Sequence, residues 1–404
     1  ENTKKAYGIP TDLQASNNAT TQMVWGPGTF GYSKLQLEMF KKESCPLLNM
    51  DRVVFDTANH GEAGGDNFGE GNLDVKMTSA FGLNVLTVVS NTNTSSATEE
   101  GNGFGEALLD FVTDLYQRSE VPHVLSMSLG SLSAASCNLL CAEAVKQGES
   151  QSECEEFLQE QRQVCMYLTE KQTQRINQGL QILGSRGITV LGSSGDGGSH
   201  FSFGQFSGGH MAEVLNDISC EFQLPVFPTA SPYVLSVGGE QWKDGDMSQP
   251  IAWDGSGGGF SWQFPALAHQ TATVANYLQT THGLPAASSY NASGRAYPDV
   301  AAISTDGTSQ SCPTVAGILS LVIDHRLNQG LPPLGFIAPR LYKVATEFPG
   351  EAFQDIPSGN TKTVCDNGFP ATSSWDPVTG WGRPQWSGLL KHFGSDNSTS
   401  RRSI

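Results

Sequence analysis

The chain reads Gly307-Thr308-Ser309-Gln310-Ser311-Cys312-Pro313, and an apolar run from Val315 to Val322 follows at once. Glycine begins a turn here, and the run behind it has the character of a buried helix, so Ser309 is predicted to lie on a turn that leads into a helix. A hydroxyl in that place is exposed and lies near the positive end of the helix dipole. Ser309 is therefore a candidate nucleophile, although serine is also a common N-cap residue.

A second stretch, Glu70-Gly71-Asn72-Leu73-Asp74, carries two carboxylates four residues apart. That spacing puts both on one face of a helix. Because two like charges so close disfavour each other, one carboxyl should hold its proton more tightly. Such a pair suits serine chemistry at acidic pH. The alternative is a solvated helix face, the usual place for acidic pairs, but the glycine-rich flank from Gly61 to Gly71 is unusual for a plain amphipathic helix.

These residues resemble the sedolisins, the serine-carboxyl peptidases. The family's nucleophile motif, Ser-Gly-Thr-Ser-x-Ser-x-Pro, matches the first stretch with Asp306 in place of the leading serine. The family's Glu-x-x-x-Asp helix matches Glu70 and Asp74, and its third catalytic carboxylate, in a Ser-Gly-Asp turn after a buried strand, matches Asp196. Further segments agree in the same order over nearly the whole chain, namely 122–130, 227–234, 257–261 and 295–302.

The resemblance implies a role for each catalytic candidate. Ser309 is the nucleophile, and Glu70 is the general base that takes its proton and returns it to the leaving amine. Asp74 hydrogen-bonds Glu70, orients it and shares its proton. Asp196 is a protonated acid that donates to the oxyanion, with the Ser309 backbone N–H as the second donor. The alternative for Asp196 is an ordinary Asp-Gly turn that closes a strand.

Histidine is the rival candidate for the base. His60 lies close to Glu70 in sequence, and His200 lies just past Asp196. The subtilisin signature His-Gly-Thr-His is absent from the sequence, so we expect no histidine base.

Two glycine-containing segments are predicted to flank the substrate, since glycine lets a peptide backbone approach and pair as an added strand. The alternative is a bulge or turn. The substrate-binding candidates are Ser128, Leu129, Gly130, Gly257 and Gly258.

The resemblance also implies a calcium site in loops within residues 352–384. Carboxylates and backbone carbonyls are the hard oxygen ligands that suit Ca²⁺. The implied ligands are Asp355, Ile356, Thr372, Ser374 and Asp376. The family usually has glycine at the third and fourth of these positions, which puts the detail of the loop in question.

Short apolar runs alternate with helical patterns along the chain. We expect buried strands at 52–55, 83–89, 123–127 and 188–191, and helices at 70–81, 105–117 and 168–184. This alternation predicts an α/β fold with a mainly parallel sheet and helices on both faces. The resemblance implies a subtilisin-like single catalytic domain over 1–393, and a polar tail at 394–404 that we expect to be mobile.

Composition and cysteines bound the functional class. The net charge of −17 argues against nucleic acid or an anionic membrane as partner. No apolar run reaches transmembrane length. Eight cysteines and the sequons at Asn18, Asn93, Asn291 and Asn397 indicate a secreted glycoprotein. The chain starts at Glu1 rather than Met, which suggests a processed start, and the family is made with an N-terminal propeptide.

Four cysteines, Cys137, Cys141, Cys154 and Cys165, crowd into one polar stretch that the resemblance marks as an insertion at 132–166. Two local disulfides there would staple a helical excursion with little core of its own, and three pairings are possible. By resemblance Cys220 and Cys365 form a pair. Cys45 and Cys312 are then left over, and Cys312 is expected to be a buried small residue.

The link before the nucleophile turn departs from the family. Sedolisins have a further strand and loop between the Pro-Asp segment and this turn, whereas only residues 303–306 separate Ala302 from Gly307. Either the protein lacks this hairpin or a loop is missing from this part of the chain, and so short a link favours the second alternative.

The sequence thus predicts an acid serine-carboxyl peptidase that cleaves peptides through an acyl-enzyme, either an endopeptidase or a tripeptidyl aminopeptidase. The expected location is outside the cell or in an acidic, lysosome-like compartment. The alternative is a catalytically inactive protein of the same fold that only binds its partner.

Overall fold

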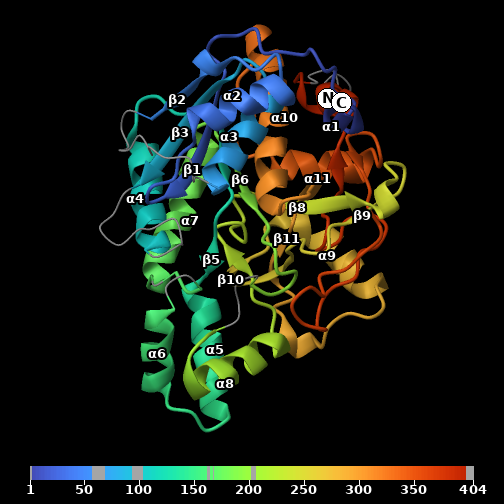
Figure 1. The fold of residues 1–404 in the computed structure, drawn as a ribbon. Helices are drawn as coiled ribbons and strands as arrows, with labels where there is room; N and C mark the ends of the chain where they lie inside the picture. The colour runs from blue at the N-terminus through green and yellow to red at the C-terminus, as the bar shows by residue number, and fades with distance from the viewer. Residues whose placement is uncertain are drawn as a thin grey trace, which may run out of the picture.

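The computed structural model describes residues 2–56, 69–92, 103–161, 164–166, 168–201 and 206–396. Within these ranges a central sheet runs through the body of the molecule, and helices pack on both of its faces (Figure 1). The predicted α/β class is therefore confirmed.

The central sheet of the described chain has eight strands: β1 (Thr21–Pro27), β2 (Val53–Phe55), β3 (Leu86–Thr92), β4 (Val124–Met127), β6 (Thr189–Ser193), β8 (Leu235–Trp242), β9 (Pro250–Ala252) and β12 (Val300–Ile303). Their order is β12-β8-β6-β4-β1-β3-β2, and all these neighbours pair in parallel. The exception is β9, which pairs antiparallel with β8. Because parallel strands end at one edge, the turns that follow β4, β6 and β12 gather on the same side of the sheet.

All four predicted strands are present, as β2, β3, β4 and β6, but β3 begins at Leu86 and not at 83. Asn84 has a left-handed φ of 64°, so the residues before Leu86 form a turn. The hydrophobic pattern missed β1 and β8. Thr21 and Gln22 make the start of β1 look polar, although β1 lies in the middle of the sheet.

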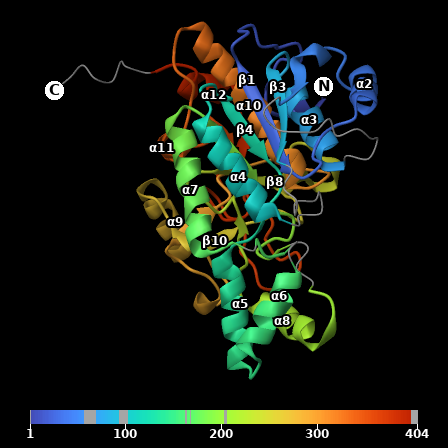
Figure 2. The same ribbon diagram turned by 90° about the vertical axis from the view of Figure 1, so that its left-hand side faces the viewer.

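The two faces of the sheet are covered by different helices (Figures 1 and 2). The face on one side carries α3 (Gly69–Phe81) and α10 (Thr308–Asn328), and the other carries α4 (Phe104–Gln117) and α7 (Glu170–Ser185). Side chains of successive residues in a strand point to opposite faces of the sheet, and β1 shows this pattern. Val24 packs with Val75 of α3, whereas Trp25 stacks on Phe111 of α4 at 4.7 Å between ring centres.

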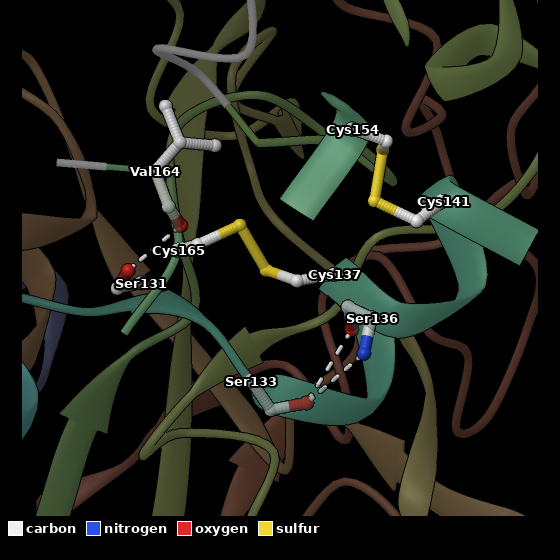
Figure 3. Close-up of a disulfide and its surroundings, with 8 residues drawn as sticks. All are labelled: Ser131, Ser133, Ser136, Cys137, Cys141, Cys154, Val164 and Cys165. Carbon is white, nitrogen blue, oxygen red and sulfur yellow. Dashed lines mark hydrogen bonds between the residues drawn. A yellow bond between two sulfur atoms is a disulfide. The ribbon is translucent and has the colours of Figure 1, made fainter. Parts of the chain in front are cut away.

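The predicted insertion forms an extension at one end of the molecule (Figure 2). It contains α5 (Ala134–Lys146) and α6 (Gln151–Glu160), against which α8 (Gly209–Glu221) packs. The disulfides Cys137–Cys165 and Cys141–Cys154 cross-link it, which selects one of the three open pairings (Figure 3).

The insertion packs around a core that it shares with a later part of the chain. The side chains of Leu140, Leu158, Leu215 and Ile218 are buried in one cluster with the sulfur atoms of both disulfides. Leu215 and Ile218 belong to α8, about sixty residues further along the chain, so the insertion taken alone did not reveal this contribution.

The third disulfide joins Cys220 at the end of α8 to Cys365, as the resemblance implies. The remaining described elements are α1 (Asn2–Ala6), α2 (Lys34–Glu43), β5 (Ser131–Leu132), β7 (Val226–Phe227), β10 (Gly259–Pro265), α9 (Ala268–Thr280), β11 (Gly294–Tyr297), α11 (Ala338–Glu347), β13 (Phe353–Gln354), β14 (Arg383–Pro384) and α12 (Trp386–Phe393).

None of the helices in the described ranges has the length and apolar character needed to cross a bilayer. Of the four predicted glycosylation sites, Asn93 and Asn397 lie outside the described residues, as does most of the predicted tail. Asn18 is exposed, whereas the amide of Asn291 donates to the carbonyl of Ser261.

Candidate active site

The candidate nucleophile lies where α10 begins, at the edge of the sheet where the strands end. Ser309 is 9 % exposed, and its hydroxyl lies close enough to the carboxylate of Glu70, in the first turn of α3, to lower the pKa of that carboxyl. Its Oγ also lies 3.4 Å from the carbonyl oxygen of Ser128, just past β4. Residues from three distant parts of the sequence thus meet around one hydroxyl.

Pro313, in the nucleophile motif, removes one helical hydrogen bond at this turn. Pro313 has no N–H, so the carbonyl of Ser309 lacks the usual helical donor four residues on. The hydroxyl oxygen of Ser128 lies 3.4 Å from that carbonyl, and its proton goes to the nearer carboxyl of Asp74 at 2.8 Å. The nucleophile turn therefore lies against the end of β4 at both the backbone and the side chain of Ser309.

Asp74 lies one helical turn beyond Glu70 and is completely buried. Its Oδ1 accepts a hydrogen bond of 2.8 Å from the Ser128 hydroxyl. The hydrogen bond that we expected between Asp74 and Glu70 is not found. Instead Glu70 Oε1 and Asp74 Oδ2 are both buried without a hydrogen-bond partner among the described residues.

Burial raises the pKa of both carboxyl groups, and a neighbouring negative charge adds to each rise. For Glu70 the main cause is loss of solvation, the nearby Ser309 hydroxyl opposes the rise in its pKa, and the charge of Asp196 adds to it. For Asp74, burial and the charge of Glu70 raise the pKa well above the ordinary value. The pair therefore retains a proton that two solvated carboxylates would lose.

Asp196 follows β6 and reaches the same turn from the other side. Its Oδ1 accepts hydrogen bonds from the backbone N–H of Thr308 at 2.8 Å and from the Thr308 hydroxyl at 2.7 Å. The Thr308 hydroxyl in turn accepts from the N–H of Gly195 at 3.1 Å. Thr308, for which the sequence suggested no role, joins the Asp196 loop to the start of α10.

Gly307 is required by this close approach. Its φ is +85°, and a Cβ built on it would lie 2.5 Å from Asp196 Oδ2. Burial raises the pKa of Asp196, although the two hydrogen bonds from Thr308 work against the rise in its pKa. The charge of Asp196 also raises the pKa of Glu70, so the two carboxyls lie in electrostatic reach of each other.

The short link before the turn is accommodated without a further strand. After β12 the Ser304 hydroxyl donates to the carbonyl of Gly307 at 2.6 Å. The side-chain oxygen of Gln310 accepts from the backbone N–H groups of Thr305 at 2.6 Å and Asp306 at 3.2 Å. The link therefore folds as a compact turn braced by Gln310, and Ser309 reaches Glu70 from it.

Of the two rival histidines, His60 lies outside the described residues. His200 is buried, neither of its ring nitrogens has a hydrogen-bond partner among the described residues, and burial lowers its pKa to about 4.

The predicted substrate-flanking residues differ among themselves. Ser128 contacts both Asp74 and Ser309, as described above, and Leu129 and Gly130 are partly exposed beside it. Gly257 and Gly258 are buried, and their N–H groups donate to the carbonyls of Gly195 and Gly198. A Cβ on Gly257 would lie 2.2 Å from the carbonyl oxygen of Ser194. Glycine is needed there for packing within the chain, so the structure gives a different reason for it than an approaching peptide.

The predicted calcium ligands lie together in the loops around β13 and β14. Asp376 is fully buried, and its Oδ2 accepts from the N–H of Thr372 at 2.8 Å. Asp355 Oδ2 accepts from the N–H of Ser374 at 2.8 Å, and Asp355 Oδ1 accepts from that of Ile356 at 2.9 Å. Ser374 has a φ of +75°, a conformation that glycine adopts without strain, which matches the glycine usual there in the family.

This donor set fits a hard cation. Burial raises the pKa of Asp376 to about 7, with a smaller contribution from the charge of Asp355. Two carboxylates and neighbouring carbonyls are the oxygen donors that Ca²⁺ prefers. The described residues contain no group of three or more acidic, histidine or cysteine side chains suited to a metal, so any ion here depends on carbonyl ligands.

Cys312, three residues past Ser309, is fully buried as expected. Its sulfur lies 3.4 Å from the Ser126 hydroxyl, and burial raises the pKa of its thiol to about 12.

A parallel sheet with Ser309, Glu70, Asp74 and Asp196 at its carboxyl edge defines a serine-carboxyl type of site on a subtilisin-like fold. Among solved structures, the chain is similar to a Pseudomonas sedolisin, a serine-carboxyl proteinase complexed with two molecules of pseudo-iodotyrostatin. The TM-score is 0.64 with 20% sequence identity, and the match covers 97% of each chain. No protein-family model matches the chain.

The chain therefore has the sedolisin fold. In sequence it is similar to human tripeptidyl-peptidase 1, with 34% identity over 346 residues that cover 80% of this chain and 51% of that protein. It is 40% identical to mouse tripeptidyl-peptidase 1 over 238 residues, which cover 54% of this chain and 39% of that protein. The chain thus spans about half the length of these relatives.

Proposed function

We propose that this protein is an acid serine-carboxyl peptidase that hydrolyses peptide bonds through an acyl-enzyme on Ser309. The single observation that carries the proposal is that the Ser309 hydroxyl lies against the buried carboxyl of Glu70, while Asp74 and Asp196 approach the same turn through Ser128 and Thr308. In the proposed mechanism Glu70 must be ionised to act as the base, while Asp74 and Asp196 keep their protons. Acidic solution favours this combination of protonation states.

In the proposed reaction the Ser309 oxygen attacks the peptide carbonyl while its proton moves to Glu70. The tetrahedral oxyanion accepts hydrogen bonds from protonated Asp196 and from the Ser309 N–H, one of the first four N–H groups of α10, which have no helical acceptor. Glu70 then gives the proton to the leaving amine, and the acyl-enzyme forms. A water molecule then attacks the acyl-enzyme, and Glu70 takes the proton of the water as base. This step releases the acid product and restores the Ser309 hydroxyl.

Asp74 and Ser128 act on Glu70 and Ser309 through this network. Asp74 keeps a proton near Glu70, which limits the repulsion that a second charge would add when Glu70 ionises. The Ser128 hydroxyl links Asp74 to the nucleophile turn. Both are therefore positioning residues.

Activity is expected to be highest at acidic pH and to fade towards neutrality. Burial raises the pKa of Asp196 above the usual value, so its acid form survives past pH ~4 and is lost as the pH rises through that raised pKa. An amide donates without a proton to lose, so Asp196→Asn should keep measurable activity, with its decline moved to higher pH. The measurement is kcat/KM against pH for both proteins with a peptide substrate.

Two results would contradict this assignment. A parent maximum at neutral or alkaline pH would restore a histidine base. An Asp196→Asn variant without activity at every pH, yet folded by circular dichroism, would show that Asp196 does more than donate one hydrogen bond.

The alternative is a protein of this fold that binds peptides without cleaving them. A peptide aldehyde, which forms a hemiacetal with an active serine, separates the two proposals, because only the peptidase gives a covalent adduct on Ser309 by mass spectrometry. Whether the enzyme cuts within chains or removes tripeptides from free N-termini is decided by sequencing the products of a mixed peptide library. The names of the relatives favour the second mode.

We further propose that the protein is made with a propeptide and works in an acidic compartment, secreted or lysosome-like. Three disulfides indicate folding in an oxidising environment. The net charge of −17 still argues against nucleic acid and anionic membranes as partners.

Removing Ca²⁺ is expected to lower thermal stability. Asp355, Asp376 and the carbonyls of Ile356, Thr372 and Ser374 would hold the ion and relieve the unpaired charge of two neighbouring carboxylates. An ion that binds only the folded state adds roughly 3 kcal/mol when its free concentration exceeds Kd a hundredfold. A chelator should therefore lower Tm by several degrees in the parent and leave Asp355→Asn unaffected. An unchanged parent Tm, with no Ca²⁺ in elemental analysis, removes the site.

A further inference from the structure

A lysine at the start of the chain is buried without a partner. The side chain of Lys4, in α1, is 7 % exposed, and its Nζ has no hydrogen-bond partner among the described residues. Burial lowers the pKa of this amine to about 8, against a smaller upward effect from Cys45 and Asp12. The group is still an ammonium at acidic and neutral pH, and an unpaired buried charge is costly.

This lysine borders a pocket of about 700 Å³ between α1, the end of α2 and α3. That size lies within the usual range for a site that binds a small molecule. The walls are mixed: Phe40, Met77, Phe81 and Leu83 supply apolar surface, while Thr3, Thr11, Ser44 and Gln310 supply polar groups. The lining also includes one carboxylate, that of the exposed Glu43.

We propose that this pocket binds a small organic monocarboxylate with an apolar body, whose carboxylate pairs with Lys4. A carboxylate supplies the charge-assisted hydrogen bond that the ammonium lacks. An aliphatic or aromatic body covers the apolar part of the walls. Glu43 disfavours a ligand with a second negative charge, and a neutral ligand leaves Lys4 unpaired.

The pocket also shares a side chain with the catalytic turn. Gln310, which follows Ser309 and braces the turn through Thr305 and Asp306, lines this pocket. Met77 and Phe81 belong to α3, the helix that carries Glu70 and Asp74. A bound ligand would therefore contact the two helices that hold the candidate site.

The test is isothermal titration of the full chain with 3-phenylpropionate at pH 6, next to its neutral amide. We expect saturable binding of the acid and at least about tenfold weaker binding of the amide, since a hydrogen bond to a charged group is worth about that factor. Lys4→Met should weaken binding of the acid to a similar extent. Lys5→Met, which removes an exposed charge from the same helix, should bind like the parent.

Thermal melting without ligand adds an independent measurement. Lys4→Met should melt at or above the parent temperature, because it removes a buried charge that has no partner. If Lys4→Met is less stable, Lys4 is structural and the proposal fails. Ser44→Trp, which fills the pocket rim and leaves Lys4 in place, should also abolish binding.

The proposal is overturned if the parent gives no saturable heat, if acid and amide bind equally, or if Ser44→Trp binds like the parent. The same titration on Ser309→Ala keeps this result separate from the proposed peptidase activity. Binding there should equal that of the parent, and a loss of binding would mean that the probe occupies the catalytic site.

Discussion

Ser309→Ala is expected to lower kcat by at least about 10⁴-fold, because the Ser309 hydroxyl is the group proposed to form the covalent bond. The fold should persist. Among the described residues the Ser309 hydroxyl lies near Glu70 and Ser128, so its loss should cost about 1 kcal/mol of unfolding free energy, comparable to a helix cap. The measurements are single-turnover cleavage of a peptide and thermal melting.

A matched control lies two residues further along the same helix. The buried hydroxyl of Ser311 donates to the carbonyl of Ala302 at 2.9 Å and does not contact the candidate site. Ser311→Ala should cost a similar amount of stability and leave turnover close to that of the parent. If Ser309→Ala still cleaves peptide, the nucleophile is misassigned, and the compact link from Ser304 to Gly307 is the first segment to reconsider.

The candidate site could be predicted from the sequence because its residues belong to short local patterns. Glu70 and Asp74 lie on one helix face whatever surrounds them, and Gly307 places Ser309 on a turn by its backbone alone. Their meeting depends on the parallel sheet, which the alternation of strands and helices also predicted.

What the sequence did not reveal depends on packing between distant segments. Gly257 and Gly258 suggested an approaching peptide, but the backbone that comes close to them belongs to residues 194–198 and 377 of the same chain. The core of the insertion needs α8. The roles of Thr308 and Gln310 appear only when the Asp196 loop and the short link lie against the turn. Single-sequence patterns carry no information on such contacts.

The second large effect is expected when the proposed general base, Glu70, is replaced. Glu70→Gln is expected to lower kcat/KM by about 10³-fold, since a general base contributes roughly 10²–10⁴ and an amide cannot accept the serine proton. Glutamine has nearly the same shape and still reaches the Ser309 hydroxyl, so substrate binding should change little. Glu38→Gln, an exposed acid on α2, is the matched control and should retain parent activity.

The thermal stability of Glu70→Gln shows whether a loss of activity comes from the missing base or from unfolding. Because the folded protein raises the pKa of Glu70, its contribution to stability is full below the unfolded value of ~4.3 and declines as the pH rises through the folded pKa. Removing the ionisable group removes that decline, and it also removes repulsion with Asp74 and Asp196. Glu70→Gln should therefore melt at or above the parent temperature at neutral pH while its activity is lost. If it keeps activity within about tenfold of the parent, Glu70 is not the general base. A variant that melts well below the parent would instead assign the glutamate a structural role, and its inactivity would say nothing about proton transfer.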